Sequence, residues 1–203
     1  MSNSQSTPNQ YSFLETATIQ WEGGLPASTR FNDLYFSRVS GIDETRYVFL
    51  KHNQLTERFN AMKAGETFTI GETGFGTGLN FLCVWQLFLT HAPESTNLLF
   101  ISTEKYPLQP KDLTRALSLF KELDSLIKEL TNAYVLDPKN IALSFTDAGN
   151  HKSIQLNILI GDVVETLPTI KHSIDAWFLD GFSPAKNPDL WQPRLFEIIQ
   201  EKR

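Results

Sequence analysis

The sequence predicts an α/β protein built around a parallel sheet, and its order of strands, glycines and helices carries this prediction. A strand pattern over residues 67–72 leads into three glycines at alternate positions and then into an apolar run, residues 79–89, long enough for a helix. Two further apolar stretches, 98–102 and 176–179, each lead to an acidic residue. Because strand, glycine turn and helix form the first half of a βαβ unit, we expect the later stretches to join the same sheet.

The glycine turn indicates a binding site at the start of this helix. A dinucleotide-binding turn needs a third glycine where Leu79 stands, and a P-loop needs a lysine, which the sequence lacks between Lys63 and Lys105. An acid at the strand end, Glu72, would repel a pyrophosphate but suits a cationic amine or sulfonium, so S-adenosylmethionine fits. A turn that only packs a helix on a strand is the alternative, but it needs fewer glycines and no acid. The candidate cofactor-binding residues here are Glu72, Gly74, Phe75, Gly76, Gly78 and Asn80.

Composition describes an ordinary globular chain. Its 203 residues, 41% hydrophobic and 20% charged, suit one domain with a substantial core. The net charge of −5 argues against a broad nucleic-acid-binding face within these residues. Cys83 is the only cysteine, which excludes an internal disulfide and a cysteine-based zinc site, and the histidines lack metal-ligand spacing. The sequence shows no signal peptide and no long apolar run, so we expect a cytoplasmic protein without a metal or a membrane contact.

We divide the chain into three parts. Residues 1–17 begin with a polar stretch that predicts disorder, residues 18–66 form an N-terminal appendage, and residues 67–203 form the core. Within the core, periodic apolar positions predict one long or two consecutive helices over 113–130. Two alternating stretches joined by a turn predict a β-hairpin over 141–160.

The appendage carries weaker patterns. Asp43 stands where it could cap a helix over residues 45–50, and a second short helix is expected over 55–62. The aromatic residues Tyr35 and Phe36 are interpreted as core packing, with contact to a ligand as the alternative.

Acidic residues at the ends of the second and third core strands are candidate contacts to a nucleoside. Glu104 follows the strand 98–102, where a carboxylate can accept hydrogen bonds from both ribose hydroxyls, and Lys105 is grouped with it. Asp162 follows the second arm of the hairpin. It could reach an adenine amino group or cap the next helix, and the two roles are compatible.

The fourth unit is the most distinctive. Asp180 ends the strand 176–179, and the fourth strand of such a sheet normally lies beside the first, which places this carboxylate beside the glycine turn. The loop that follows carries Phe182, Ser183 and Pro184, and proline makes it stiff. An ordinary loop needs no acid, aromatic residue and proline in that order. We therefore assign all four as candidate catalytic residues, with Asp180 also next to the cofactor.

Four stretches of the chain match a known family. They are residues 31–37 (FNDLYFS), 44–50 (ETRYVFL), 71–82 (GETGFGTGLNFL) and 175–191 (DAWFLDGFSPAKNPDLW). On these stretches the chain resembles, from about residue 19 to its end, the methyltransferase domain of the bacterial tRNA 5-methylaminomethyl-2-thiouridine biosynthesis bifunctional protein family, the MnmC-type family. The last stretch is specific to that family, whereas the glycine turn is shared with most class I methyltransferases.

The resemblance implies a class I, Rossmann-like, S-adenosylmethionine-dependent methyltransferase. It implies methylation of the aminomethyl group on the wobble 2-thiouridine of tRNA, the final step to 5-methylaminomethyl-2-thiouridine. It also implies an FAD-dependent oxidoreductase domain in cis, with FAD confined to that second domain. The class I sheet is larger than the four core strand units in this sequence, so we expect the C-terminal part of the sheet to be truncated. The tRNA-facing basic surface would then lie outside these residues.

The chemistry of methyl transfer constrains the role of Asp180. An alkylamine has a pKa of about 10 and an aspartate of about 4, so Asp180 is a poor base unless the site shifts both values strongly. We favour Asp180 as an acceptor that orients the amine N–H, with the role of base as the alternative. Two other functions stay open, a small-molecule amine methyltransferase and a non-catalytic nucleoside-binding module. The second would be expected to lose Asp180 or the Ser183-Pro184 pair, and the sequence has both.

Overall fold

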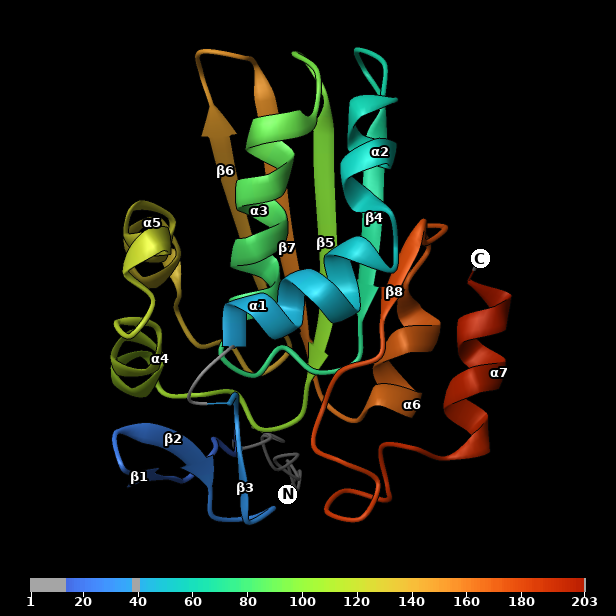
Figure 1. Ribbon diagram of the computed structural model, residues 1–203. Coiled ribbons are helices and arrows are strands. Elements are labelled where there is room, and N and C mark those ends of the chain that lie inside the picture. The colour runs from blue at the N-terminus through green and yellow to red at the C-terminus, as the bar shows by residue number, and fades with distance from the viewer. Residues whose placement is uncertain (1–13, 38–40, 203) are drawn as a thin grey trace, which may run out of the picture.

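A computed structural model describes residues 14–37 and 41–202 of the chain. The core sheet has five strands in the order β6-β7-β5-β4-β8, with helices on both faces (Figure 1). Its strands are β4 (Thr67–Glu72), β5 (Asn97–Glu104), β6 (Asn140–Asp147), β7 (Lys152–Ile160) and β8 (Ala176–Phe178). All pairs are parallel except β6 with β7, which form the predicted hairpin.

The first core strand lies between the second and the fourth, as the sequence predicts. Ile70 of β4 is opposite Phe100 of β5 on one side and Ala176 of β8 on the other. The strand order therefore reverses at β4, which has β5 and β7 to one side and β8 to the other. Among the described residues β8 pairs only with β4 and so forms one edge of the sheet.

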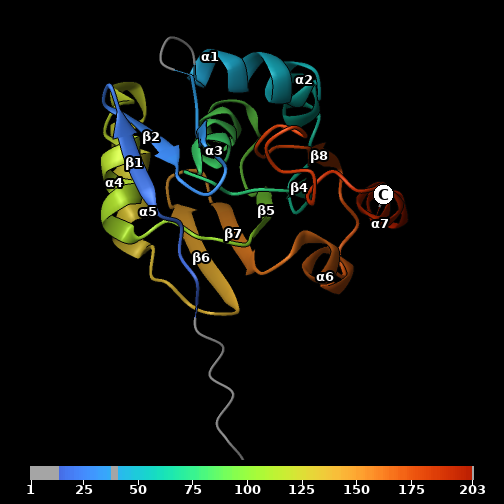
Figure 2. The same ribbon diagram turned by 90° about the horizontal axis from the view of Figure 1, so that it is seen from below.

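Alternate residues of the central strand face opposite layers of helices. In β5, Leu98 and Phe100 join one hydrophobic cluster, whereas Leu99 and Ile101 join the other, because side chains alternate across a strand. Figure 2 shows α1 and α2 on one side of the sheet and α6 and α7 on the other. The first layer holds α1 (Gly41–Thr45), α2 (Leu55–Asn60), α3 (Leu79–His91), α4 (Pro110–Leu117) and α5 (Asp124–Ala133). The second layer holds α6 (Val163–Thr166) and α7 (Pro193–Glu201).

A glycine inside β4 allows β8 to pack closely. A Cβ atom on Gly71 would lie 2.6 Å from Cζ3 of Trp177, which is nearer than real contacts allow. The indole ring of Trp177 therefore covers bare backbone of its neighbouring strand. This contact fixes the strand that leads to Asp180 against the strand that leads into the glycine turn.

The appendage forms a small antiparallel sheet at the carboxyl ends of the parallel strands (Figure 1). Its strands are β1 (Ile19–Glu22), β2 (Leu25–Ser28) and β3 (Asp33–Leu34). The helix expected over 45–50 begins earlier, as α1, and continues as a π-helix over Arg46–Lys51. The prediction that Asp43 caps this helix is wrong, because Asp43 lies inside the first turn of α1. An acidic residue is favourable there too, since it faces the positive end of the helix dipole.

The segment 1–17 is expected to be disordered, and its residues 1–13 lie outside the described part of the chain. Its end makes contacts: Ala17 N–H donates to the Pro107 carbonyl at 3.1 Å, and the Gln109 amide donates to the Thr16 hydroxyl at 3.0 Å. Within residues 14–37 and 41–202, every helix is too short or too polar to cross a lipid bilayer.

Candidate active site

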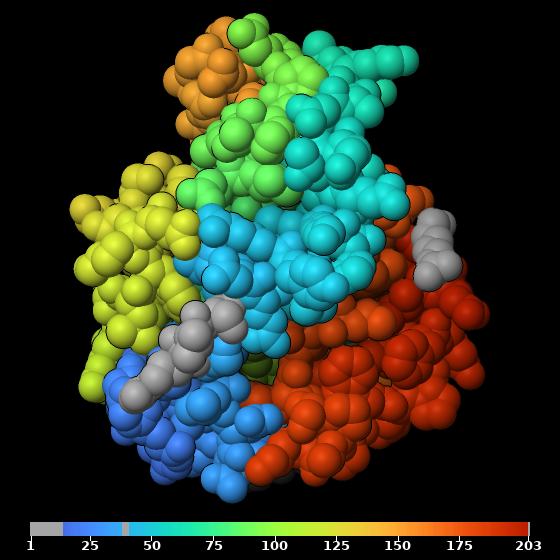
Figure 3. Space-filling view, viewed as in Figure 1, coloured from blue at the N-terminus to red at the C-terminus, as the bar shows by residue number. Residues whose placement is uncertain are grey.

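A cavity of about 1000 Å³ opens at the carboxyl ends of β4, β5 and β8. The glycine turn, the ends of β5 and β7, the loop after β8 and the appendage all contribute to its lining. In Figure 3 the blue surface of the appendage and the orange-red surface that follows β8 adjoin below the light-blue α1 segment. The cavity lies where the strand order reverses, which is where doubly wound sheets bind their ligands. Its volume suits a cofactor or a nucleoside.

The glycine turn brings bare backbone to this cavity. Gly76 and Gly78 have positive φ angles of 52° and 74°, a region that side-chain-bearing residues rarely adopt. A Cβ atom on Gly74 would lie 3.3 Å from the main-chain oxygen of Asp180. The lack of side chains therefore lets the loop after β8 approach the turn and leaves the start of α3 open to the cavity.

Glu104 is fastened to the glycine turn. One carboxylate oxygen, Oε2, accepts the Gly76 N–H at 2.9 Å, and the other, Oε1, accepts the Tyr106 N–H at 2.9 Å. Burial raises the pKa of Glu104, and these backbone N–H groups oppose that rise. Each oxygen has two lone pairs, so a held carboxylate can still accept hydrogen bonds from a ligand.

Lys105 and Asp162 form an ion pair beside Glu104. Lys105 Nζ lies 2.9 Å from Asp162 Oδ2, and this bond raises the pKa of Lys105. The other oxygen of Asp162 accepts the Val164 N–H at 3.1 Å, which caps α6. The capping role expected for Asp162 is therefore confirmed, and its contact to an adenine stays a prediction.

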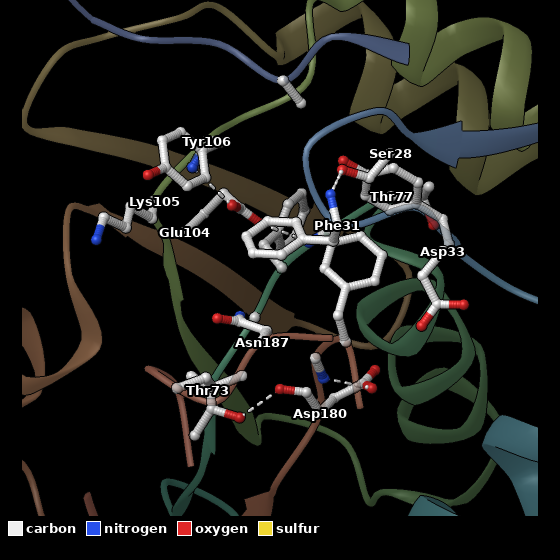
Figure 4. A pocket seen from close by; sticks show the side chains of 18 of the residues that line it. Ser28, Phe31, Asp33, Thr73, Thr77, Glu104, Lys105, Tyr106, Asp180 and Asn187 are labelled. Carbon is white, nitrogen blue, oxygen red and sulfur yellow. Dashed lines mark hydrogen bonds between the residues drawn. The ribbon is translucent and has the colours of Figure 1, made fainter. Parts of the chain in front are cut away.

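Asp180 is held at the opposite side of the cavity from the Glu104 group (Figure 4). Its Oδ2 accepts the Asn80 amide at 2.6 Å, and its Oδ1 accepts the Gly181 N–H at 2.7 Å. Its main-chain oxygen accepts the Thr73 hydroxyl at 2.6 Å. Burial raises the pKa of Asp180, whereas the Gly181 and Asn80 donors act to lower it. The carboxylate is thus oriented from two sides and still borders the cavity.

Glu72 does not face the cavity, contrary to the expectation that it meets a cationic ligand. It is 0% exposed, and Asn80 Nδ2 and the Ser102 hydroxyl donate to its two oxygens at 2.9 and 2.6 Å. These two donors turn the carboxyl group inward, behind the glycine turn. Burial, together with the neighbouring charge of Asp180, raises its pKa to about 8.

Aromatic rings from distant segments cover the cavity. Phe182 stacks on Phe31 with ring centroids 4.7 Å apart and meets Tyr35 edge-on at 5.2 Å. Lys186 Nζ reinforces this contact by donating to the Asn32 carbonyl at 3.0 Å. Tyr35 and Phe36 pack against the core, as interpreted from the sequence, but both also line the cavity.

The structure brings most predicted site residues to one cavity. Those that line it are Gly74, Phe75, Gly76, Asn80, Glu104, Lys105, Asp162, Asp180, Phe182 and Ser183. Glu72, Gly78 and Pro184 are absent from the lining: Glu72 is buried behind the turn, Gly78 is the last glycine of the turn, and Pro184 is exposed on the loop. Sequence reasoning missed Thr73, Phe31 and Thr45, which also line the cavity. For Phe31 a signal existed, since it opens the aromatic-rich stretch 31–36.

Known proteins resemble this chain in sequence. Residues 121–203 match a family described as S-adenosyl-L-methionine-dependent methyltransferase. The chain is 52% identical over 182 residues to the tRNA 5-methylaminomethyl-2-thiouridine biosynthesis bifunctional protein MnmC of Chromobacterium violaceum. It is 54% identical over 182 residues to the protein of the same name from Pseudomonas paraeruginosa. In both cases the match covers 89% of this chain, and the chain spans 27% of the length of the relative.

A solved structure resembles the fold. MNMC2 from Aquifex aeolicus superposes with a TM-score of 0.60 at 22% identity, over 93% of this chain and 56% of that one. This likeness supports the Rossmann-like architecture alone, and the architecture agrees with the parallel sheet and the glycine turn found here. The chain therefore belongs to the S-adenosyl-L-methionine-dependent methyltransferases and corresponds to the methyltransferase portion of the MnmC family.

Proposed function

We propose that this chain transfers a methyl group from S-adenosylmethionine to the aminomethyl group on the wobble 2-thiouridine of tRNA. The observation that carries the proposal is the position of Asp180. Its oriented carboxylate borders the cavity that the glycine turn and Glu104 also line. A single cavity thus offers a place for a nucleoside cofactor at one side and for an amine at another.

The residues of the cavity fit S-adenosylmethionine. A side chain on Gly76 would be strained by its φ of 52° and would point toward Tyr35, 3.5 Å away, so the turn is built for bare backbone. Glu104 keeps acceptor capacity at the end of the second core strand, where ribose hydroxyls bind in related sheets. The cofactor supplies an electrophilic methyl group on a sulfonium when bound, and the chain supplies its position.

The role of the chain in the chemistry is to align and desolvate the amine. Asp180 accepts one hydrogen bond on each oxygen, so each oxygen retains a lone pair for an N–H of the acceptor. The rings of Phe31, Tyr35 and Phe182 exclude water from this side of the cavity, and exclusion of water lowers the pKa of an amine. A neutral, aligned amine could then take the methyl group by in-line attack, with the cofactor leaving as a neutral thioether and the methylated ammonium losing its proton to water. Asp180 therefore acts as an orienting acceptor.

The relatives support a tRNA substrate, since they are named for tRNA 5-methylaminomethyl-2-thiouridine biosynthesis and described as bifunctional. The chain spans 27% of their length, which leaves room for the second activity. We assign that activity to an FAD-dependent oxidoreductase domain in cis that prepares the amine. A tRNA substrate also places the protein in the cytoplasm.

The test is methyl transfer from labelled S-adenosylmethionine to tRNA that carries the unmethylated aminomethyl group. We expect label in that tRNA and none in tRNA that already carries the methyl group. Free alkylamines should not be labelled, since a small-molecule amine methyltransferase would act on them without RNA. Cofactor binding without transfer to either acceptor would support a nucleoside-binding module and contradict the proposal.

A further inference from the structure

The side-chain amide of Asn80 connects three other side chains. Its Nδ2 donates to Glu72 Oε1 at 2.9 Å and to Asp180 Oδ2 at 2.6 Å. Its Oδ1 accepts the hydroxyl of Thr45 at 2.8 Å. Both N–H donors and the carbonyl oxygen are therefore used in a nearly closed environment, where Asn80 is 7% exposed.

The orientation of this amide matters because its two ends are nearly equal in shape and opposite in hydrogen bonding. Turned by half a rotation, Asn80 would present its oxygen to the carboxyl groups of Glu72 and Asp180, and no N–H would reach either. The carboxyl groups of Glu72 and Asp180 favour the arrangement found, because their oxygens accept the two N–H bonds. The Thr45 hydroxyl donates to the oxygen at the other end of the amide and so holds that end in place.

Thr45 is well placed to fix this arrangement. It is the last residue of α1, is 4% exposed and comes from the appendage, outside the core that carries Asn80 and Asp180. The π-helix that follows packs Leu50 into the same hydrophobic cluster as α3. The hydroxyl is thus held on a packed segment and does not belong to a free loop.

Asn80 in turn is the one side chain among the described residues that donates to the Asp180 carboxylate. The other donor, the Gly181 N–H, belongs to the next residue of the same loop and moves with it. Thr73 holds the main chain of Asp180 to the turn, whereas Asn80, among the described residues, is the side chain that holds its carboxylate relative to α3. Without the bond from Asn80, the oxygen Oδ2 of Asp180 would no longer be held at a fixed position relative to the cofactor side of the cavity.

We propose that Thr45 is a positioning residue for methyl transfer: its hydroxyl anchors the oxygen end of the Asn80 amide, and the anchored amide holds the Asp180 carboxylate against the acceptor amine. The inference rests on the proposed function of Asp180. It gives the appendage a role in the reaction centre beyond covering the cavity. It also separates two tasks, since Glu104 and the glycine turn hold the cofactor without help from Thr45.

The test replaces Thr45 in the full chain with valine, which has the same shape and no hydroxyl. We expect Thr45→Val to lower kcat with tRNA by about tenfold and to raise the KM for tRNA, because the buried oxygen of Asn80 loses its hydrogen-bond partner and the amide shifts away from Asp180. The affinity for S-adenosylmethionine should stay within about twofold of wild type. Thr45→Ser, which keeps the hydroxyl, should restore turnover.

Thr131→Val is the matched control, since the Thr131 hydroxyl bonds to the Ile127 carbonyl of its own helix, away from the cavity. Wild-type kcat in folded Thr45→Val, or an equal loss in Thr45→Ser, overturns the inference. If Thr45→Val does not fold, Thr45→Cys takes its place, and wild-type kcat in that variant likewise overturns the inference, because a thiol is a weak donor. Absence of methyl transfer by the wild-type chain would instead refute the proposed function.

Discussion

The ring of Phe182 stacks on the ring of Phe31, with centroids 4.7 Å apart and planes inclined by 29°. Phe31 belongs to the appendage, and Phe182 follows Asp180 in the loop after β8. The pair therefore closes one side of the cavity with two segments that are distant in sequence. An offset aromatic pair contributes about 0.5–1.5 kcal/mol beyond the burial of its surface.

Replacing Phe182 with alanine should open this side of the cavity to water. We expect the KM for tRNA to rise by about three- to tenfold, which corresponds to the loss of the aromatic pair. Steady-state kinetics with saturating S-adenosylmethionine measure this change. Phe196→Ala is the control, since Phe196 is 43% exposed on α7 and is absent from the cavity lining. An unchanged KM in Phe182→Ala would show that the stack does not serve the acceptor side.

Replacing Gly76 with valine should abolish cofactor binding. The φ of 52° at this position strains a β-branched residue, and its side chain would enter the space between the turn and Tyr35. Calorimetric titration with S-adenosylmethionine measures the loss. Gly65→Val isolates the backbone effect, because Gly65 also has a positive φ, 86°, and a Cβ there would meet nothing within 4 Å. If folded Gly76→Val binds the cofactor like Gly65→Val, the turn is not the cofactor site.

Asp180→Asn should reduce methyl transfer strongly while the fold is kept. The new amide would direct N–H groups at either the Asn80 amide or the acceptor amine, so the hydrogen bond that aligns the acceptor is lost. We expect a loss of turnover of at least about 100-fold in single-turnover kinetics, with cofactor affinity nearly unchanged. Asp137→Asn is the control, since the Asp137 carboxylate likewise accepts two hydrogen bonds, both from backbone N–H groups, but is exposed and remote from the cavity. Single-turnover rates near wild type would make Asp180 a structural residue.

Glu104→Ala should weaken the binding of S-adenosylmethionine by about 1.5–3 kcal/mol, as expected when hydrogen bonds to a charged group are lost. The change also frees the Gly76 N–H, so the turn loses an anchor as well. Turnover at saturating cofactor should be largely kept, which separates this variant from Asp180→Asn. The control Glu122→Ala removes a carboxylate that pairs with Arg46 outside the cavity. Equal affinity in Glu104→Ala and wild type would rule out a ribose contact.

The buried carboxyl group of Glu72 predicts a pH dependence of stability. Its pKa is raised from 4.5 to about 8, so between these values the folded chain keeps a proton that the unfolded chain releases. The free energy of unfolding should therefore fall as pH rises through this window, by at most about 1.4 kcal/mol per pH unit from this group. Above the folded pKa the loss is complete, and below the ordinary value this contribution is fully present.

Glu72→Gln should flatten this dependence, because glutamine resembles the protonated form at every pH. Urea unfolding between about pH 5 and about pH 8 measures the slope in variant and wild type. Glu104 and Asp180 also have raised pKa values and keep part of the slope in both proteins. Glu122→Gln should keep the wild-type slope, since Glu122 is half exposed. Identical slopes in Glu72→Gln and wild type would mean that Glu72 is ionised in the folded chain.

The sequence by itself determined the frame of the site. The strand pattern 67–72, the glycine turn and the apolar run 79–89 predict β4, its turn and α3, because each is encoded in a contiguous stretch. The carboxyl ends of parallel strands meet at one edge of a sheet, so the places of Glu104 and Asp180 followed from their strands. The position of Asp162 followed in the same way. Its capping bond joins residues only two apart in the chain, so the sequence alone could predict it.

Only the tertiary structure decided which side chains meet. Nothing local to Glu72 shows that Ser102 and Asn80 turn it away from the cavity, and nothing in the appendage shows that Thr45 reaches Asn80. The start of α1 before Asp43 escaped prediction for a related reason, since an acid is favourable both as a cap and in the first turn. Periodicity reports which face of a segment is buried, whereas hydrogen bonds between distant segments depend on how the layers pack. The orientation of Asp180 is therefore a property of the folded chain, although the residue itself was visible in the sequence.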